Sequence, residues 1–427
     1  LDAERNLTIN QKEGYSYVHP EDDDKIEVIE YLDAERNLTI NQKEGYSYVR
    51  FQYGRQGESQ VITSTFYDSL GQPVYLPGLG YAAVERLYDK SGFLIQETYR
   101  DENGVITYRN DYMVAEILYE YGDDGNLSRI WYKDAEERPA NRLDTGYAVV
   151  YQEYEAGQLV RRRYEGYRNG SLCPVPDKTT GIYDAVYQYT KGKLQQEQYF
   201  DDEGSPALRS DLGCAAISYE YDDNGNISCR RYYGTDGKPI LRKDTGYAVI
   251  KCQYNDEERY KLFQYLGVDE QPVIHSEKHC AGIREIYEGD NLVEIQYLGL
   301  DGNLMNRSDY GIARVYKTYY NDGKQKTEEY FDAEGNPAVR KEYGCAMFES
   351  FYYDDGALKE RRYYAFPEGR QELVMRRDTG YAIIRYEYDS NGNQNSQTYF
   401  DADEQPVVST KYHCAGILSE YDDYGNE

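Results

Sequence analysis

Apolar and polar residues alternate over short runs along this chain, and no run follows the 3.6-residue period of an amphipathic helix. The run AVVYQEY at 148–154 is β-branched and aromatic, and the run NISCRRY at 226–232 is a second, more polar example. Alternation of this kind predicts strands with two unlike faces. We therefore expect an all-β protein.

Two kinds of turn separate these runs. Asp-x-x-Gly, as at 222–225 and 389–392, is typical of a type I turn followed by a left-handed residue, a common hairpin connection. Asp-x-x-Gly-x-Pro, as at 332–337, follows the returning strand. Because proline cannot donate to a strand ladder, the segment after it is expected at an edge or in a loop. Each unit should hold two long strands and one short or irregular strand.

The pattern repeats along the whole chain. Residues 1–18 recur without change at 32–49, and later units open on an aromatic residue every 32 to 36 residues. The units open near Leu1, Tyr31, Phe66, Tyr99, Tyr132, Tyr164, Tyr199, Tyr232, Tyr265, Tyr297, Tyr330, Tyr363 and Tyr399. This predicts one continuous array over residues 1–427: a tandem-repeat β-solenoid, or a spiralling sheet of β-hairpins, of about 13 units.

A longer similarity spans about four units. The segment at 269–283 resembles the segment at 403–417, a shift of 134 residues. Duplication of blocks of units explains this without structural meaning, and the alternative is that four units make one superhelical turn.

Composition favours thin β layers with much surface. The chain has 52 Tyr against 10 Phe and 1 Trp, and tyrosine suits half-buried sheet positions where the hydroxyl stays wet. The net charge of -29 repels phosphate backbones and anionic membrane surfaces, so we expect neither nucleic-acid binding nor membrane insertion. The chain begins and ends inside a repeat, which suggests an excerpt of a longer, extracellular or surface protein.

Cysteines and histidines occupy repeat positions. Cys214, Cys280, Cys345 and Cys414 stand directly before Ala, where other units carry Tyr, and are expected to be buried thiols in a core position. His279 and His413 replace the glycine before that position. No paired CxxC spacing occurs, so no metal site is predicted.

Catalytic motifs are not apparent in this sequence, and we expect no enzyme and no cofactor. The Asp-rich turns offer oxygen ligands for calcium, but they lack the spaced Asp residues and distal Glu of a calcium loop. Turn formation alone explains these aspartates.

Aromatic side chains are the best candidates for contact with a ligand. Tyr147, Tyr247 and Tyr381 follow the same glycine of the repeat, and Trp131 is the only tryptophan. Such rings could stack on sugars. The units opened by Tyr164 and Tyr363 carry longer, irregular loops, which either tune binding or reflect neutral insertion.

The stretches YDKSG at 88–92, YDDNGN at 221–226, YDSNGN at 388–393 and YDDYGN at 421–426 resemble the YD, or Rhs-type, repeats of large bacterial surface and toxin-delivery proteins. This resemblance implies successive β-hairpins that spiral into a sheet or hollow shell, in a secreted or surface scaffold. The unit here is longer, and Asn often replaces the Arg that follows Gly, so a closed shell and an open ribbon both remain alternatives.

The leading hypothesis is therefore a secreted or cell-surface repeat scaffold for adhesion or for attachment to a glycan, a cell-wall polymer or another surface protein. One alternative is a non-catalytic shell or spacer of a larger toxin or surface protein. Another is a self-assembling extracellular fibre, in which terminal units pair end to end.

Overall fold

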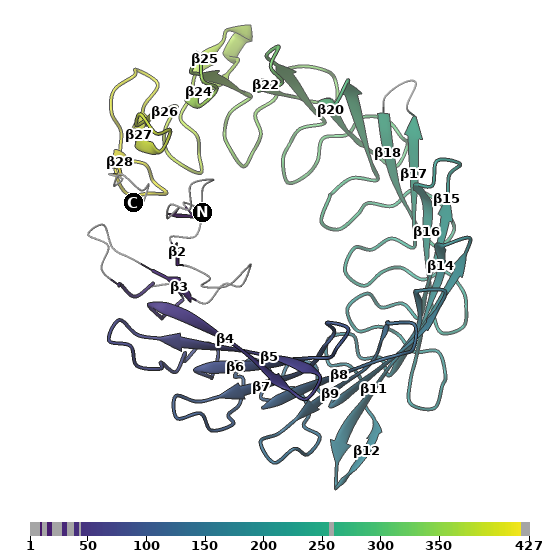
Figure 1. The fold of residues 1–427 in the computed structure, drawn as a ribbon. Coiled ribbons are helices and arrows are strands. Elements are labelled where there is room, and N and C mark those ends of the chain that lie inside the picture. The colour runs from purple at the N-terminus through teal and green to yellow at the C-terminus, as the bar shows by residue number, and fades with distance from the viewer. Residues whose placement is uncertain are drawn as a thin grey trace. The chain divides into compact units, whose positions relative to one another are not determined.

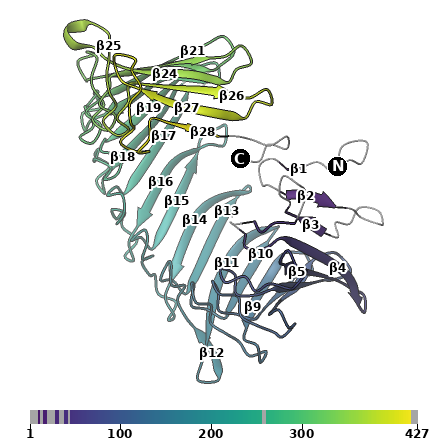
Figure 2. The same cartoon turned by 90° about the vertical axis from the view of Figure 1, so that its left-hand side faces the viewer.

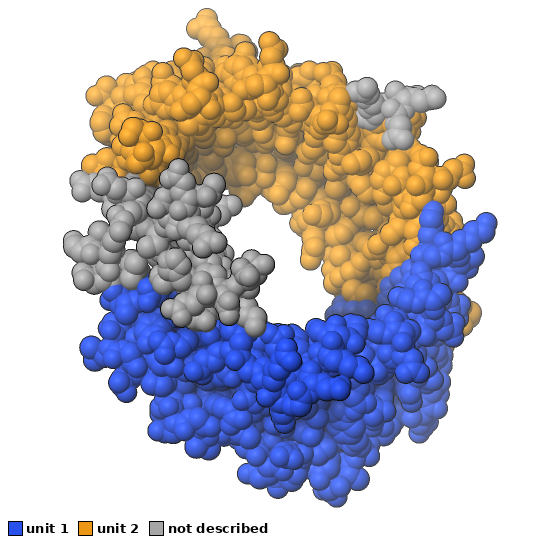
Figure 3. All heavy atoms as spheres, in the orientation of Figure 1, with its two compact units in different colours: residues 1–211, 422–426 blue, residues 212–421, 427 orange. Residues whose placement is uncertain are grey.

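A computed structural model describes residues 9–10, 15–18, 28–31, 38–41, 44–255 and 260–419. By contacts the chain divides into two compact units, shown in different colours in Figure 3. The described residues of unit 1 lie within 9–211, and those of unit 2 lie within 212–419. The boundary falls inside the repeat opened by Tyr199, so it does not coincide with a repeat opening. The single array over 1–427 stays a prediction, and its opening at Leu1 and the stretch at 421–426 lie outside the described residues.

The described elements are strands, apart from one short 3-10 helix (Figure 1). Unit 1 holds β1 (Ile9–Asn10), β2 (Tyr15–Val18), β3 (Val28–Glu30), β4 (Tyr48–Gln56), β5 (Ser59–Tyr67), β6 (Ala83–Tyr88), β7 (Leu94–Arg100), β8 (Glu116–Tyr121), β9 (Leu127–Lys133), β10 (Val149–Glu155), β11 (Gln158–Arg168), β12 (Ser171–Pro174), β13 (Asp184–Thr190) and β14 (Lys193–Phe200). Unit 2 holds β15 (Ala216–Tyr221), β16 (Ile227–Tyr233), β17 (Val249–Asn255), β18 (Tyr260–Leu266), β19 (Gly282–Glu288), β20 (Asn291–Leu298), β21 (Arg314–Tyr319), β22 (Gln325–Phe331), β23 (Met347–Tyr352), β24 (Leu358–Ala365), η1 (Pro367–Gly369), β25 (Glu372–Leu373), β26 (Ile383–Tyr388), β27 (Gln394–Phe400) and β28 (Gly416–Leu418).

Within each unit the strands pair in chain order, and the printed pairings are antiparallel (Figure 2). The exceptions in order are β12 and β25, which each form a side hairpin, so that β11 pairs with β13 and β24 with β26. The all-β prediction is confirmed, in its form as a sheet of successive hairpins.

The Asp-x-x-Gly turns close the hairpins as predicted. In the turn between β6 and β7, Oδ1 of Asp89 accepts hydrogen bonds from the amides of Ser91 (2.8 Å) and Phe93 (2.9 Å). Gly92 occupies the left-handed region at φ 85°, which a side chain would disfavour. The aspartate therefore serves the backbone of its own turn.

The segment after the second turn is irregular, as predicted. Pro337 forms an isolated bridge with Phe331, and the amide of Ala338 donates to the carbonyl of Tyr330 at 2.9 Å. The chain then leaves the sheet edge and forms a loop instead of a third strand. In the two longer repeats, the short strands β12 and β25 replace the isolated bridge, while the amides of Val175 and Val374 still donate to the carbonyls of Tyr164 and Tyr363.

The core is a narrow layer between the sheet and these loops. Its largest fully buried side chains are the tyrosines that open the units, among them Tyr99, Tyr199, Tyr232, Tyr330 and Tyr399. One such ring per repeat makes too small a core to stabilise a repeat by itself, so each repeat depends on contacts with the repeats beside it.

A matched pair of glycines tests the loop backbone. Gly213 and Gly246 occupy the same repeat position, with φ 72° and 75°. Gly246→Ala should lower the free energy of unfolding by about 1–2 kcal/mol, the cost of a left-handed alanine. Gly213→Ala should cost more, because its new Cβ would lie 2.9 Å from Cβ of Lys243. Urea unfolding of both variants measures the difference, and equal costs would contradict it.

Candidate functional site

The loop that leaves the sheet has the same backbone in most units. In the loop at 242–247, the amide of Arg242 donates to the carbonyl of Tyr247 (2.8 Å), and the amide of Gly246 donates to the carbonyl of Arg242 (2.9 Å). We call this six-residue segment the repeat loop. Counterparts with the same two bonds lie at 76–81, 109–114, 142–147, 177–182, 275–280, 307–312, 340–345, 376–381 and 409–414, and the two bonds also join Asn41 with Tyr46 and Gly45. The segment at 209–214 has the same position in the sequence repeat, and we call it a repeat loop too. The repeat loop is thus a built feature and not a variable linker.

An arginine opens many repeat loops and pairs with an acidic residue two positions later. Nε of Arg307 lies 3.0 Å from Oδ1 of Asp309, and its Nη2 lies 2.6 Å from Oδ2. The equivalent two-pronged pairs are Arg109–Asp111, Arg142–Asp144, Arg209–Asp211, Arg242–Asp244 and Arg376–Asp378. Arg340 makes a single contact with Glu342 through Nη2 (2.7 Å). A two-pronged guanidinium–carboxylate contact fixes the loop geometry more firmly than a single bond would.

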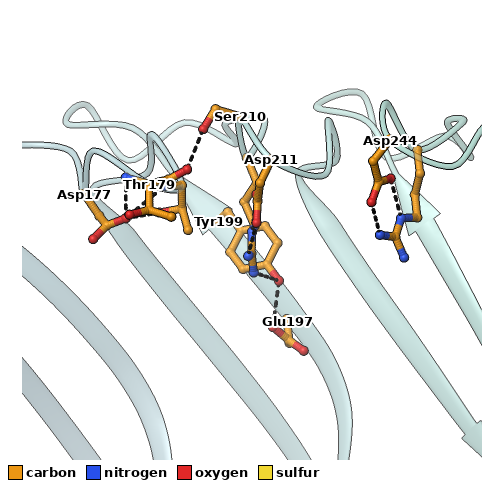
Figure 4. Close-up of polar contacts among 10 residues, drawn as sticks. Asp177, Thr179, Glu197, Tyr199, Ser210, Asp211 and Asp244 are labelled. Carbon is orange, nitrogen blue, oxygen red and sulfur yellow. Dashed lines mark hydrogen bonds and ion pairs between the residues drawn. The ribbon is translucent and has the colours of Figure 1, made fainter. Parts of the chain in front are cut away.

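The arginine also ties the loop to the core tyrosine beneath it. Nη1 of Arg209 donates to the hydroxyl of Tyr199 (3.2 Å). That hydroxyl donates to Oε2 of Glu197 (2.6 Å; Figure 4). Together with Asp211, these residues form a hydrogen-bonded series of four polar side chains that includes the buried ring of Tyr199. Burial raises the pKa of Tyr199, and the Glu197 carboxylate raises it further, so the hydroxyl stays protonated. These hydrogen bonds fix the loop against the sheet.

Neighbouring repeat loops are joined to one another. In unit 2, the amide of Lys243 donates to the carbonyl of Leu212 (2.9 Å), and that of Ser276 donates to the carbonyl of Thr245 (3.0 Å). In unit 1, the amide of Ser210 donates to the carbonyl of Thr180 (2.7 Å), and its hydroxyl donates to the carbonyl of Thr179 (3.0 Å; Figure 4). Within each compact unit, repeats joined in this way therefore meet twice, through strand pairing and through hydrogen bonds between their loops.

Arginine and tyrosine side chains also stack along the loops. Tyr310 lies between the guanidinium carbons of Arg307 and Arg340, each 4.0 Å from its ring centroid. Tyr343 lies between Arg340 and Arg376, at 4.1 and 4.3 Å. Contacts of a guanidinium with an aromatic face are worth about 0.5–2 kcal/mol each. This column links three successive loops of unit 2.

The three candidate tyrosines lie inside the core. Tyr147, Tyr247 and Tyr381 are 9%, 5% and 5% exposed. Each ring lies between the opening aromatic of its own unit and that of the next. For Tyr147 these neighbours are Tyr132 and Tyr164, at centroid distances of 6.0 and 4.8 Å. Their role as ligand contacts stays a prediction. In the structure these rings pack between adjacent repeats.

Trp131 lies on the opposite face of the sheet from the repeat loops and is half-buried. Its indole Nε1 donates to Oε1 of Glu120 (2.8 Å), and Arg129 lies beside it, 5.7 Å from the ring and 4.9 Å from the ring of Tyr151. The hydroxyl of Tyr151 donates to Glu165 (2.7 Å). These side chains form a small platform of rings and charges on the sheet.

The core position of the cysteines is confirmed for three of four. Cys214, Cys280 and Cys345 are fully buried, whereas Cys414 is half-buried. Burial raises the pKa of Cys280 and Cys345 to about 11, so these thiols stay protonated and inert. His279 and His413 take the left-handed conformation of the glycine they replace, with φ 51° and 57°.

Within the part of the chain that the structure describes, no group of three or more His, Cys, Asp or Glu side chains is arranged to hold a metal ion. The same residues contain no helix that is long and apolar enough to cross a membrane.

The Arg-x-Asp pairs are the functional feature that our sequence reasoning missed. They stand four and two residues before the left-handed position, for example Arg242 and Asp244 before Gly246. Aligning the units on that glycine would have exposed the recurrence. Charged residues are so common in this chain that the pattern does not stand out otherwise.

No family model matches the chain, and no curated protein matches it. Among solved structures it is similar to TcdB2-TccC3, with 11% identity, a TM-score of 0.18, and coverage of 91% of this chain and 28% of that one. It is also similar to the Photorhabdus luminescens Tc holotoxin pore, with 10% identity, a TM-score of 0.18, and coverage of 92% and 26%. A porin-like protein from Bacteroides uniformis gives 9% identity, a TM-score of 0.18, and coverage of 81% and 91%.

The chain thus spans about a quarter of the length of the two toxin chains, 28% and 26%. A TM-score of 0.18 is too low to identify a family or a function.

Proposed function

We propose that this chain is a non-catalytic repeat scaffold that forms a structural segment of a larger secreted or surface-exposed protein. A shell or spacer of a larger toxin or surface protein falls within this proposal. Under this proposal, the binding partner of the segment is the rest of the larger protein, and other domains of that protein carry its activity.

One observation carries the proposal: most of the described repeats are joined to a neighbouring repeat in two layers. Strand pairing joins the hairpins, and the repeat loops add their own ladder, in which Ser276 also donates through its hydroxyl to the carbonyl of Asp244 (2.8 Å). The conspicuous side chains, including the Arg-x-Asp pairs and the buried tyrosines, are used within these joints. Repeats that are joined in these two ways suit a structural role.

An extracellular setting is part of the proposal. The strong negative charge supports solubility, and buried, protonated thiols such as Cys280 resist oxidation. Secretion assays on the natural full-length protein would test this location.

Glycan attachment is the second candidate, and the Trp131 platform is the observation that favours it. Indole and phenol rings stack on sugar faces, and Glu120 and Arg129 beside them could hydrogen-bond sugar hydroxyls. The buried Tyr147 is not accessible in the same way.

The test deletes one whole repeat, residues 297–329, so that Tyr330 takes the place of Tyr297. For a scaffold we expect the same strand content by circular dichroism, a lower unfolding midpoint, and no saturable binding to glycans or isolated bacterial walls before or after deletion. Collapse into an unfolded chain would contradict the modular scaffold. Saturable binding by the intact chain, abolished by Trp131→Ala with the fold retained, would replace it with the second candidate.

A further inference from the structure

The arginine of the repeat loop is replaced in some repeats, and three of the replacement side chains, Asp177, His275 and Ser409, accept hydrogen bonds from the backbone of their own loop. Oδ1 of Asp177 accepts hydrogen bonds from the amides of Thr179 (3.0 Å) and Thr180 (2.8 Å; Figure 4). Oγ of Ser409 accepts from the amides two and three residues later, each at 3.3 Å. In these loops a side-chain acceptor caps the turn that the Arg–Asp pair holds elsewhere.

His275 is the histidine among these replacements. Its Nδ1 accepts hydrogen bonds from the amides of Glu277 (3.2 Å) and Lys278 (3.3 Å). The side chain is 5% exposed, with ring centroids 5.3 Å from Tyr247 and 4.6 Å from Tyr265. Nδ1 can accept these bonds only while it carries no proton. A group that titrates in mild acid therefore holds this one loop closed.

We propose that the repeat loop at 275–280 is a pH-sensitive joint: proton uptake at Nδ1 of His275 in mildly acidic medium opens this loop and loosens its bond to the preceding loop. The protonated Nδ1 would face two amide donors, so the turn would lose its acceptor. The preceding loop is attached at Ser276, directly beside His275, through its amide and hydroxyl. Loosening would therefore begin between the loops at 242–247 and 275–280.

The charged groups around His275 do not remove this sensitivity. From the preceding loop, Arg242 opposes protonation and Asp244 favours it, and these two are paired with each other. From its own loop, Lys278 opposes protonation and Glu277 favours it. Burial between the two tyrosine rings is the largest influence and lowers the pKa of His275 below its ordinary 6.5.

The sign of the effect follows from that direction. A base with a lowered pKa in the folded loop binds its proton more readily once the loop is open. Stability is therefore complete above pH 6.5 and falls as the pH drops from 6.5 towards the folded-state value. Arg-closed loops have no such group at this position.

Hydrogen exchange of the whole chain at pH 7.5 and pH 5 tests the joint. After correction for intrinsic exchange, we expect the opening constant of the loop at 275–280 to rise about tenfold relative to the Arg-closed loops at 242–247 and 307–312. Equal changes in all three loops would overturn the proposal.

Two variants make the test specific. His275→Ser copies the acceptor that the chain itself uses at Ser409, so it should abolish the relative rise. His279→Gly removes a neighbouring histidine from a position where glycine is usual, and it should leave the rise intact. A rise that survives His275→Ser would overturn the assignment to His275. If His275→Ser does not fold, NMR titration of the imidazoles in the unaltered chain decides: a His275 pKa at or above 6.5 would refute the joint.

Discussion

Replacing Tyr330 with alanine is expected to lower the free energy of unfolding by about 3–5 kcal/mol, the usual cost of deleting a buried aromatic ring. Tyr330 is 0% exposed and opens its repeat. Its backbone holds the second turn through the bond from Ala338, and its hydroxyl donates to Oε1 of Glu328 (2.8 Å). Loss of the ring leaves a cavity beneath the loop and removes one of the few large side chains in a narrow core. Urea unfolding followed by circular dichroism measures the change.

Two control variants separate the ring from its hydroxyl and from general effects of tyrosine. Tyr330→Phe keeps the ring, and Phe66 shows that the chain itself uses phenylalanine at this position. We expect this variant to cost about 1 kcal/mol, the value of one hydrogen bond. Tyr316→Ala, at a strand position that is 39% exposed, should change stability by less than about 0.5 kcal/mol. A cost below 1 kcal/mol for Tyr330→Ala would show that the opening aromatic is not a core residue.

Replacing Arg242 with leucine is expected to lower the free energy of unfolding by about 2–3 kcal/mol. Breaking a buried ion pair costs about 3–5 kcal/mol, and partial exposure reduces this. The Arg242 side chain is 14% exposed and that of Asp244 is 35% exposed. The guanidinium also donates to the hydroxyls of Tyr232 and Tyr247, each at 3.1 Å, so several partners lose a donor together. Urea unfolding at pH 7 measures the loss.

Another loop of the same protein suggests a second substitution that should restore part of the stability lost in Arg242→Leu. The loop at 76–81 uses leucine in place of this arginine and glycine in place of the aspartate. We therefore expect the double variant Arg242→Leu with Asp244→Gly to recover about 1 kcal/mol, because no unpaired carboxylate remains. Additive losses in the two single variants and the double variant would argue against coupling of the pair.

Acid should reduce the cost of Arg242→Leu. Burial by itself would raise the pKa of Asp244, but the hydrogen bonds and charge of Arg242 outweigh it and lower the pKa below 3.8. A carboxyl with a lowered pKa stabilises the fold above its unfolded pKa and loses that effect as the pH falls through its folded value. The difference between Arg242→Leu and the unaltered chain should therefore shrink below about pH 3.8.

Strands and turns could be predicted because their causes are local. Alternation over runs such as 148–154 depends on residues two apart, and an aspartate such as Asp89 bonds amides two and four residues later. Left-handed glycines follow from the absence of a side chain. Because the sequence repeats, each local inference made for one repeat applied to the other described repeats as well.

The candidate site was harder to predict because its contacts join residues far apart in sequence. Tyr147, which the sequence marked as a candidate ligand contact, is buried because Tyr132 and Tyr164 pack on both of its sides. The contact of Tyr310 with Arg340 crosses one whole repeat. No local pattern reports which rings are covered when units stack.

The sequence alone determined that this protein is a β-repeat chain with two strands per unit, defined hairpin turns and cysteines in core positions. Those features depend on period, turn chemistry and side-chain size, which each residue carries with it. Only the tertiary structure decided that the repeat loops join one another, that arginines close most of them, and that His275 closes one as a neutral acceptor. Burial and hydrogen-bond geometry decide such roles, and both arise only when neighbouring repeats come together.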